Sequence, residues 1–259
     1  MSNTTMNKIQ ASAFILTKNE ERNIARALSS ICDFDDVVVV DSGSTDDTIL
    51  IAQQFTDRVS IHEWEGWARQ SDLAASLCRY DWILKLDADE EATPELIAEI
   101  RSAIDNTNLS GLKIPFEERF LGLPNSRWTQ KIAKVRFWRK SRGTFGDEYV
   151  HEGLTLSGQI QSTRGCIVHY GESSVSVKVL KNDTYSNLKA MERFDRGRKF
   201  CLVKLLLTFP VAFFRSYLLR RSCCDGTRGF IQSFINAFYA FLKEAKLYEL
   251  ELNKKRSKL

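Results

Sequence analysis

The sequence predicts an α/β protein with a mostly parallel central sheet, followed by a helical C-terminal region. Three observations predict this class. Short apolar runs alternate with segments of helical spacing up to residue 115, and two of those runs lead directly into carboxylates. After residue 175 glycine becomes sparse and long helical patterns take over. We therefore expect a first domain over residues 1–175 and a helical region over residues 176–259.

Strand-like and helix-like segments alternate along the first 115 residues, as in βαβ units. The run at 37–40 consists of four valines, which is typical of a strand covered on both faces. Ser44 or Thr45 is the expected N-cap of the helix that follows it. The predicted strands lie at 11–16, 37–40, 58–61, 82–86 and 111–115, and the predicted helices at 20–31, 45–55, 67–78 and 94–104.

Beyond residue 115 the alternation ends. Basic and apolar residues alternate over 131–139, which predicts a half-buried strand, and a glycine-containing turn follows at 143–146. Residues 149–156 are strand or loop, and 165–170 form another strand.

Charge is distributed unevenly along the chain. The net charge is +4, but residues 201–259 carry 11 Lys and Arg against 4 Asp and Glu. The apolar, basic tail indicates an anionic surface as its partner, and no nucleic acid is expected. The first ten residues lack the apolar core of a signal peptide, and the six cysteines form no CxxC pair. We expect a cytoplasmic protein with reduced thiols and no zinc.

The strand at 82–86 leads directly into Asp87 and Asp89. Two neighbouring carboxylates at a strand exit suit a Mg²⁺ or Mn²⁺ ion that also holds substrate phosphates. The alternative is an acid-rich start of the helix at Pro94.

A second junction lies about forty residues earlier, where the valine run ends in Asp41 and a small-residue turn follows. Neither GxGxxG nor a Walker A motif is present, so a dinucleotide-binding fold and a P-loop ATPase are disfavoured. The first strand also ends in polar residues, including Glu20. Three strands thus deliver polar side chains to one sheet edge, where open α/β sheets bind ligands. As an alternative, Asp41 only starts a helix.

The motifs at 15–21, 39–48 and 86–90 together resemble family 2 GT-A glycosyltransferases. The similarity extends over residues 10–250 and is strongest to the lipopolysaccharide-core β-1,4-glucosyltransferase subgroup. The resemblance implies a GT-A nucleotide-sugar-binding fold, with a donor-binding half at about 10–115 and an acceptor half at about 116–175. It also implies inversion at the sugar carbon, a UDP-sugar donor and a divalent metal.

The resemblance also implies roles for individual residues. Asp41 would accept a hydrogen bond from the uracil imide, and Asp87 would lie near the ribose or the metal. Asp89 would bind the metal. His169 would be a further contact of the metal or the diphosphate, although a lone histidine is more often structural. The remaining nucleotide-sugar-binding residues would be Thr17, Asn19, Glu20, Ser44 and Gln70.

An inverting transferase needs a general base for the acceptor hydroxyl. Glu152 occupies the Val-His-Glu position of the resembled subgroup, and Asp147 and Glu148 are rivals on the same segment. A solvated loop carboxylate is the alternative. Arg136 and Arg139 either hold phosphates or form an ordinary basic strand face.

One motif departs from the family pattern. Gln70 is kept, but Ser71 and Asp72 stand where relatives have a basic residue and an amide. Arg69 is a candidate to replace the lost charge. The departure puts the identity of the donor in question.

The segment 200–219 is strongly apolar, but its longest uncharged stretch has only ten residues, too few to span a bilayer. On one helix Lys204, Thr208, Arg215 and Ser222 form a polar stripe, and Pro210 would kink or restart that helix. With the basic clusters at 220–221 and 254–256, this pattern fits an in-plane membrane anchor. An ordinary helix packed on the first domain is the alternative.

Together these features predict an enzyme on the inner face of the cytoplasmic membrane. It would transfer a hexose, glucose in the first instance, from a UDP-sugar to a lipid-linked saccharide such as the lipopolysaccharide inner core. Transfer to a polyprenyl phosphate and a non-catalytic membrane-bound nucleotide-binding protein are the alternatives. A haloacid-dehalogenase-type phosphatase is disfavoured, because Glu91 stands where its motif needs threonine.

Overall fold

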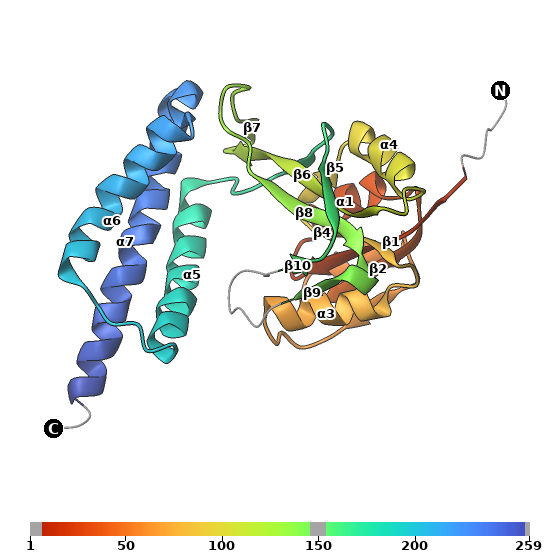
Figure 1. Cartoon of the computed structure of the whole chain (residues 1–259). Helices are drawn as coiled ribbons and strands as arrows, with labels where there is room; N and C mark the ends of the chain where they lie inside the picture. The colour runs from red at the N-terminus through yellow and green to blue at the C-terminus, as the bar shows by residue number, and fades with distance from the viewer. Residues whose placement is uncertain (1–6, 146–153, 257–259) are drawn as a thin grey trace. The chain divides into compact units, whose positions relative to one another are not determined.

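The computed structural model describes residues 7–145 and 154–256. The chain divides into two compact units (Figure 1). The first comprises residues 1–117 and 131–169, and the second comprises residues 118–130 and 170–259. Residues 118–130 thus belong with the C-terminal helices.

Four parallel strands form the first half of the main sheet, in the order β3 (Val59–Ile61), β2 (Phe34–Asp41), β1 (Ile9–Thr17) and β4 (Trp82–Asp87). The predicted parallel core is therefore confirmed. Thr17 pairs with Asp41, and Leu16 with Asp87. Because these registers align the carboxyl ends of three strands, the polar residues at their ends meet at one edge.

The sheet continues beyond β4 through antiparallel strands. β8 (Ala133–Arg139) pairs with β4 and with β6 (Leu109–Phe120), which confirms the half-buried strand expected at 131–139. β12 (Ile167–His169) pairs with the short β5 (Glu90–Ala92). The remaining strands are β7 (Leu123–Pro124), β11 (Gln159–Ser162), and a separate pair of β9 (Gly143–Phe145) and β10 (Leu154–Leu156).

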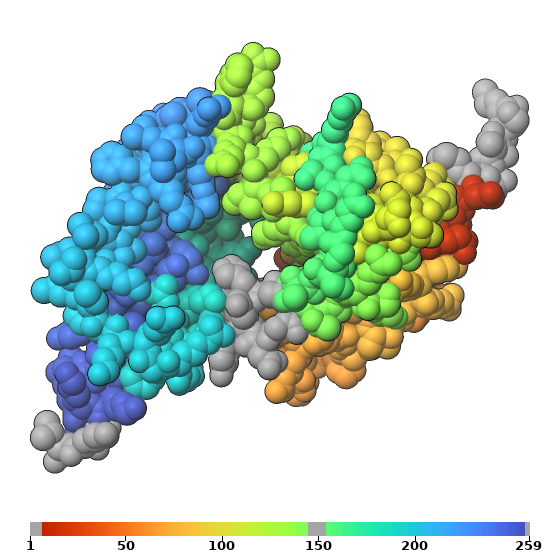
Figure 2. All heavy atoms as spheres, in the orientation of Figure 1, coloured from red at the N-terminus to blue at the C-terminus, as the bar shows by residue number. Residues whose placement is uncertain are grey.

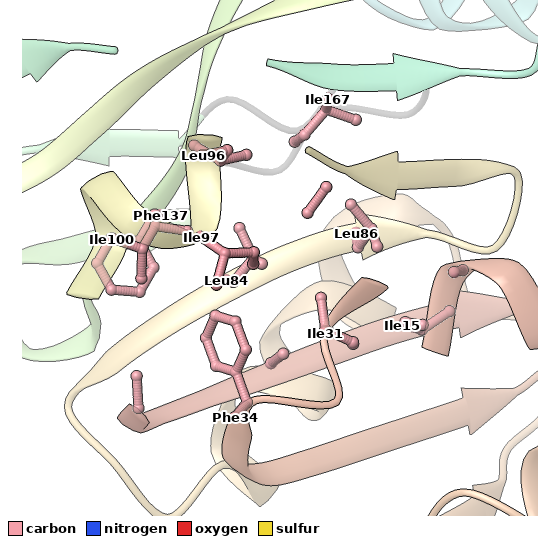
Figure 3. Close-up of a cluster of buried hydrophobic side chains, with 14 of the residues drawn as sticks. Ile15, Ile31, Phe34, Leu84, Leu86, Leu96, Ile97, Ile100, Phe137 and Ile167 are labelled. Carbon is pink, nitrogen blue, oxygen red and sulfur yellow. The ribbon is translucent and has the colours of Figure 1, made fainter. Parts of the chain in front are cut away.

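Helices cover both faces of this sheet. α1 (Ile24–Ser30), α2 (Thr48–Ala52) and α4 (Pro94–Ala103) contribute to one apolar cluster, with Leu84, Leu86 and Phe137 from the strands (Figure 3). α3 (Trp67–Leu77) packs on the opposite face around Ile83 and Trp138. Successive side chains of a strand point to opposite faces, so β4 sends Ile83, Lys85 and Asp87 to the α3 face. Lys85 thereby lies on the face of the sheet that the apolar side chains of α3 cover.

Gly165 passes very close to the start of α4. A Cβ at this position would lie 2.2 Å from the backbone nitrogen of Leu96 and 2.5 Å from its Cα. Since backbone cannot rotate away, we expect Gly165→Ala to lower the free energy of unfolding by about 1–3 kcal/mol, as overpacking does. Urea unfolding measures this. Ser102→Ala, at an exposed position of α4, is the control and should change stability by less than about 0.5 kcal/mol. An unchanged midpoint for Gly165→Ala would show that the approach relaxes freely.

The second unit consists of α5 (Val175–Asp195), α6 (Leu202–Phe214) and α7 (Gly226–Arg256), with a π-helical turn at Arg215–Leu219 and a 3-10 turn at Ser222–Asp225. Glu244 of α7 is buried and forms ion pairs with Arg193 of α5 and, at 2.8 Å, with Lys204 of α6. Three helices are thus joined at one carboxylate.

The helical segment that begins at Leu202 ends before the last residue of the predicted polar stripe. Arg221 adopts a left-handed conformation (φ 58°), which ends the helix, so Ser222 lies in the following turn. The expectation that Ser222 continues the stripe was therefore wrong. Among the described residues, the segment Leu202–Leu219 has the length and the apolar composition that a membrane-spanning helix needs.

Candidate functional site

The end of β2 is a tight turn organised by Asp41. This carboxylate is completely buried, and its Oδ1 accepts hydrogen bonds from the backbone N–H groups of Gly43 (2.9 Å) and Ser44 (2.7 Å). The Ser44 hydroxyl donates to the other oxygen, Oδ2. Gly43 has a φ of 84°, which side chains rarely adopt. Ser44 therefore closes the turn and does not cap α2, whose N-cap residue is Asp47, so that expectation was wrong.

The end of β1 is tied to the same turn. Asn19, at a φ of 55°, accepts a hydrogen bond from the Thr45 backbone N–H (2.8 Å), and its own N–H donates to the Ser44 hydroxyl (2.8 Å). The backbone N–H of Glu20 donates to Thr48 (2.7 Å). The structure thus brings the predicted residues of these two strands together. The buried hydroxyl of Thr17 has no hydrogen-bond partner in the described part of the chain.

Asp87, at the end of β4, belongs to a buried charge network. Arg136 of β8 donates from Nη2 to Asp87 Oδ2 (3.0 Å) and to Glu90 Oε1 (3.1 Å). Burial opposes ionisation of Asp87, but Arg136 outweighs it and holds the pKa of Asp87 well below its ordinary value. Burial raises the pKa of Glu90 to about 7. Arg136 is therefore more than one residue of a basic strand face, because its guanidinium group donates hydrogen bonds to two carboxylates of the site.

Lys85 is a functional candidate near this network that the sequence patterns did not predict. Its ammonium lies 3.1 Å from the Ser71 hydroxyl of α3, and burial lowers its pKa to about 7. The signal was a lysine within the otherwise apolar run 82–86. Lys85 thus supplies a basic side chain beside Ser71, the position at which the resemblance implies a basic residue. Arg69, the expected replacement, instead forms an exposed ion pair with Glu65 (3.8 Å).

Asp89 and His169 are brought together by strand pairing. His169 is the antiparallel partner of Glu90, and its Nε2 lies 3.2 Å from Asp89 Oδ2. The two residues are 80 positions apart in the sequence. A carboxylate and an imidazole nitrogen are both ligands of divalent metals.

The residues at this edge provide only part of the coordination shell of a divalent ion. Over residues 7–145 and 154–256, no group of three His, Cys, Asp or Glu side chains is placed to hold a metal. Asp89 and His169 form a pair, and Oδ1 of Asp87 is buried without a hydrogen-bond partner among the described residues. Mg²⁺ commonly uses one or two protein carboxylates and completes its shell with phosphate oxygens and water. The donor set fits such an ion.

Gln70 and Arg139 are engaged with the protein itself. The Gln70 side-chain amide donates to the Glu63 carbonyl (2.9 Å) and lies 3.3 Å from the Ser42 hydroxyl. It therefore positions the loop between β3 and α3 beside the Asp41 turn. Arg139 donates to the Leu109 carbonyl (3.1 Å). The candidate bases Glu152, Asp147 and Glu148 lie outside the described residues.

A mixed sheet with a parallel half, covered by helices and carrying acids at aligned strand ends, is the architecture of a GT-A nucleotide-sugar transferase. Residues 12–168 match the model of glycosyl transferase family 2, and the chain belongs to that family. It is a glycosyltransferase of the hexosyltransferase class.

Relatives match over nearly the whole length. The chain is 31% identical to a lipopolysaccharide core biosynthesis glycosyltransferase, LpsC, of Rhizobium meliloti, with 96% of each chain covered. It is 34% identical to an uncharacterised glycosyltransferase of Rickettsia typhi, over 93% of this chain and 87% of the relative. A crystal structure of glucosyl-3-phosphoglycerate synthase from Mycobacterium tuberculosis with phosphoglyceric acid is 17% identical, at a TM-score of 0.49, over 68% of this chain and 78% of that one. This last likeness is too low to transfer any property.

Proposed function

We propose that this family 2 glycosyltransferase transfers a hexose, glucose in the first instance, from a UDP-sugar to a lipid-linked saccharide with inversion at the sugar carbon. The acceptor we propose is the lipopolysaccharide inner core. The proposal is carried by one observation, the aligned ends of β1, β2 and β4, where buried oxygens of Thr17 and Asp87 have no hydrogen-bond partner among the described residues. Similarity to LpsC along the whole chain supports the choice of acceptor.

Asp41 is proposed as the uracil-binding residue. An ionised carboxylate accepts about four hydrogen bonds. Asp41 accepts three, two from backbone N–H groups and one from the Ser44 hydroxyl. One position thus remains for the uracil imide N–H. Because Asp41 is fully buried, the turn at Ser42–Ser44 has to move for uracil to reach that position.

Asp89 and His169 are the residues we propose for a Mg²⁺ or Mn²⁺ ion, with Asp87 beside them. The bound ion would offset negative charge on the diphosphate leaving group. Arg136 would keep Asp87 ionised and oriented for the donor. Glu152 is proposed to take the proton of the acceptor hydroxyl, with Asp147 and Glu148 as rivals.

Uridine specificity is the first test. UDP with Mn²⁺ should raise the melting temperature of the wild-type protein more than GDP with Mn²⁺. Asp41→Asn removes a charged acceptor and should weaken UDP binding by about ten- to a hundredfold, since hydrogen bonds to charged groups are worth about 1.5–3 kcal/mol. The melting temperature without nucleotide checks that the turn is intact. Equal shifts with GDP and UDP in the wild type would reject the donor assignment.

Attachment to an anionic membrane is proposed for the second unit. The apolar residues of the Leu202–Leu219 segment face outward: Val203, Leu206, Leu207, Val211, Phe214 and Leu218 are each more than half exposed. Figure 2 shows the α6 side chains, in light blue, on the surface of this unit. Helices of globular proteins normally expose their polar face, so this one has the reversed polarity expected at a bilayer surface.

Acceptor identity is tested by transfer assays with and without acceptor. Transfer to a lipopolysaccharide-core saccharide supports the proposal. Transfer only to a polyprenyl phosphate would replace the acceptor. Nucleotide binding without either donor hydrolysis or transfer would point to a non-catalytic nucleotide-binding protein.

A further inference from the structure

We propose that residues 121–130 form a second membrane contact, in which Trp128 and Leu123 enter the bilayer interface beside the end of α6. The inference rests on the proposed membrane attachment and deepens it, because it names the surface that meets the lipid. The segment belongs to the same compact unit as α5, α6 and α7.

The segment is fastened to the helices by many hydrogen bonds. Arg228 of α7 donates to the carbonyls of Phe120 (3.2 Å), Leu123 (3.0 Å) and Pro124 (3.1 Å). Asp225 accepts from the Ser126 backbone N–H and from the Thr129 hydroxyl. These bonds fix the position of the segment relative to α7.

The same bonds place the segment at the end of α6. The backbone N–H of Gln130 donates to the Arg220 carbonyl (3.0 Å), and the Thr129 hydroxyl lies 3.3 Å from the Arg221 carbonyl. Arg220 and Arg221 directly follow Leu218 and Leu219, which are 53% and 74% exposed. The segment therefore adjoins the end of the Leu202–Leu219 helix (Figures 1 and 2).

Two large apolar side chains of this segment are exposed. Trp128 is 58% exposed and Leu123 is 54% exposed. The guanidinium of Arg127 lies 4.9 Å from the centre of the Trp128 ring. An indole ring beside a cation suits the headgroup region of a bilayer, where tryptophan is enriched. Two isolated apolar side chains would need no partner, but these two lie next to the exposed Leu218 and Leu219, and larger exposed apolar surfaces mark interaction or membrane sites.

The charges around the segment identify that partner as an anionic lipid surface. Arg119 and Arg127 lie in or next to the segment, and Arg220 and Arg221 lie in the stretch to which it is hydrogen-bonded. The nearby Asp225 has its carboxylate engaged by Ser126 and Thr129. Basic residues next to a membrane-facing apolar surface attract anionic headgroups. A protein partner or the acceptor sugar would not require this one-sided charge.

The test measures binding of the full chain to phosphatidylcholine vesicles with and without phosphatidylglycerol. Trp128→Ala should weaken partition onto the anionic vesicles about tenfold, the loss expected when one large apolar side chain is no longer buried. Trp64→Ala is the matched control, because Trp64 is 44% exposed in the first unit. It should bind vesicles as the wild type does.

A second readout locates the indole itself. Brominated lipids should quench part of the tryptophan fluorescence of the wild type, and this part should disappear in Trp128→Phe. The melting-temperature shift with UDP should be unchanged in the Trp128 variants, which separates lipid binding from donor binding.

Three outcomes would overturn the inference. Wild-type binding by Trp128→Ala would reject the loop contact alone and leave attachment through α6. A wild-type protein that binds no anionic vesicles would reject the membrane attachment as well. If Trp128→Ala binds vesicles normally but transfers poorly to a soluble saccharide, the ring contacts sugar and not lipid. If the wild-type protein does not bind UDP, the donor proposal is rejected, and the conclusion from vesicle binding is unaffected.

Discussion

Glu152→Gln is expected to lower the transfer rate by about 10²–10⁴-fold, the usual contribution of a positioned general base. Glutamine keeps the size of the side chain and can still form hydrogen bonds, but it cannot accept a proton from the acceptor hydroxyl. The affinity for the UDP-sugar should stay near the wild-type value, because the lost interaction forms only in the transition state. Single-turnover transfer and a separate donor-binding measurement test the two parts.

The neighbouring acids are the matched controls for this prediction. Asp147→Asn and Glu148→Gln should retain most of the activity if Glu152 is the base. Near-normal transfer by Glu152→Gln together with loss in either neighbour would identify a different carboxylate. A small loss in all three variants would favour a phosphate acceptor, which is already anionic and needs no base.

Asp89→Asn is expected to have the second-largest effect. The amide can still contact His169, but it is a much weaker ligand for a divalent ion than a carboxylate. Loss of even an outer-shell partner of a metal ligand typically costs about 10–100-fold in metal affinity or activity, so we expect at least this loss. The Mn²⁺ dependence of the melting-temperature shift with UDP should weaken in parallel, which gives a readout independent of turnover.

Asp57→Asn is the control for this variant, since Asp57 is an exposed aspartate that precedes β3 and so lies away from the carboxyl ends of the strands. It should bind UDP and Mn²⁺ as the wild type does. Full activity of Asp89→Ala in excess EDTA would show that no metal is held at this position.

The strands and their polar ends could be predicted because their signals are local. The four valines before Asp41 and the apolar run before Asp87 each mark a buried strand that ends in an acid. Parallel pairing then has to bring these ends to one edge. The Thr17–Asp41 and Leu16–Asp87 registers agree with that expectation.

Local sequence patterns predict the wrong structure where tertiary contacts compete with them. Ser44 has a good N-cap side chain, but it bonds to the buried Asp41 instead, since that carboxylate needs donors. Ser222 has the right spacing for the polar stripe of α6, but the left-handed Arg221 ends the helix before it. Neither competing contact is visible in residue spacing.

By itself the sequence determined the α/β class, the family and the acids at the strand ends, because hydrophobic periodicity and short motifs are properties of neighbouring residues. Only the tertiary structure decided which side chains meet. It paired Asp89 with His169, placed Lys85 beside Ser71, and fastened residues 121–130 to Asp225 and Arg228. Such contacts join residues far apart in the chain, and they depend on strand register and helix packing, which no local pattern encodes.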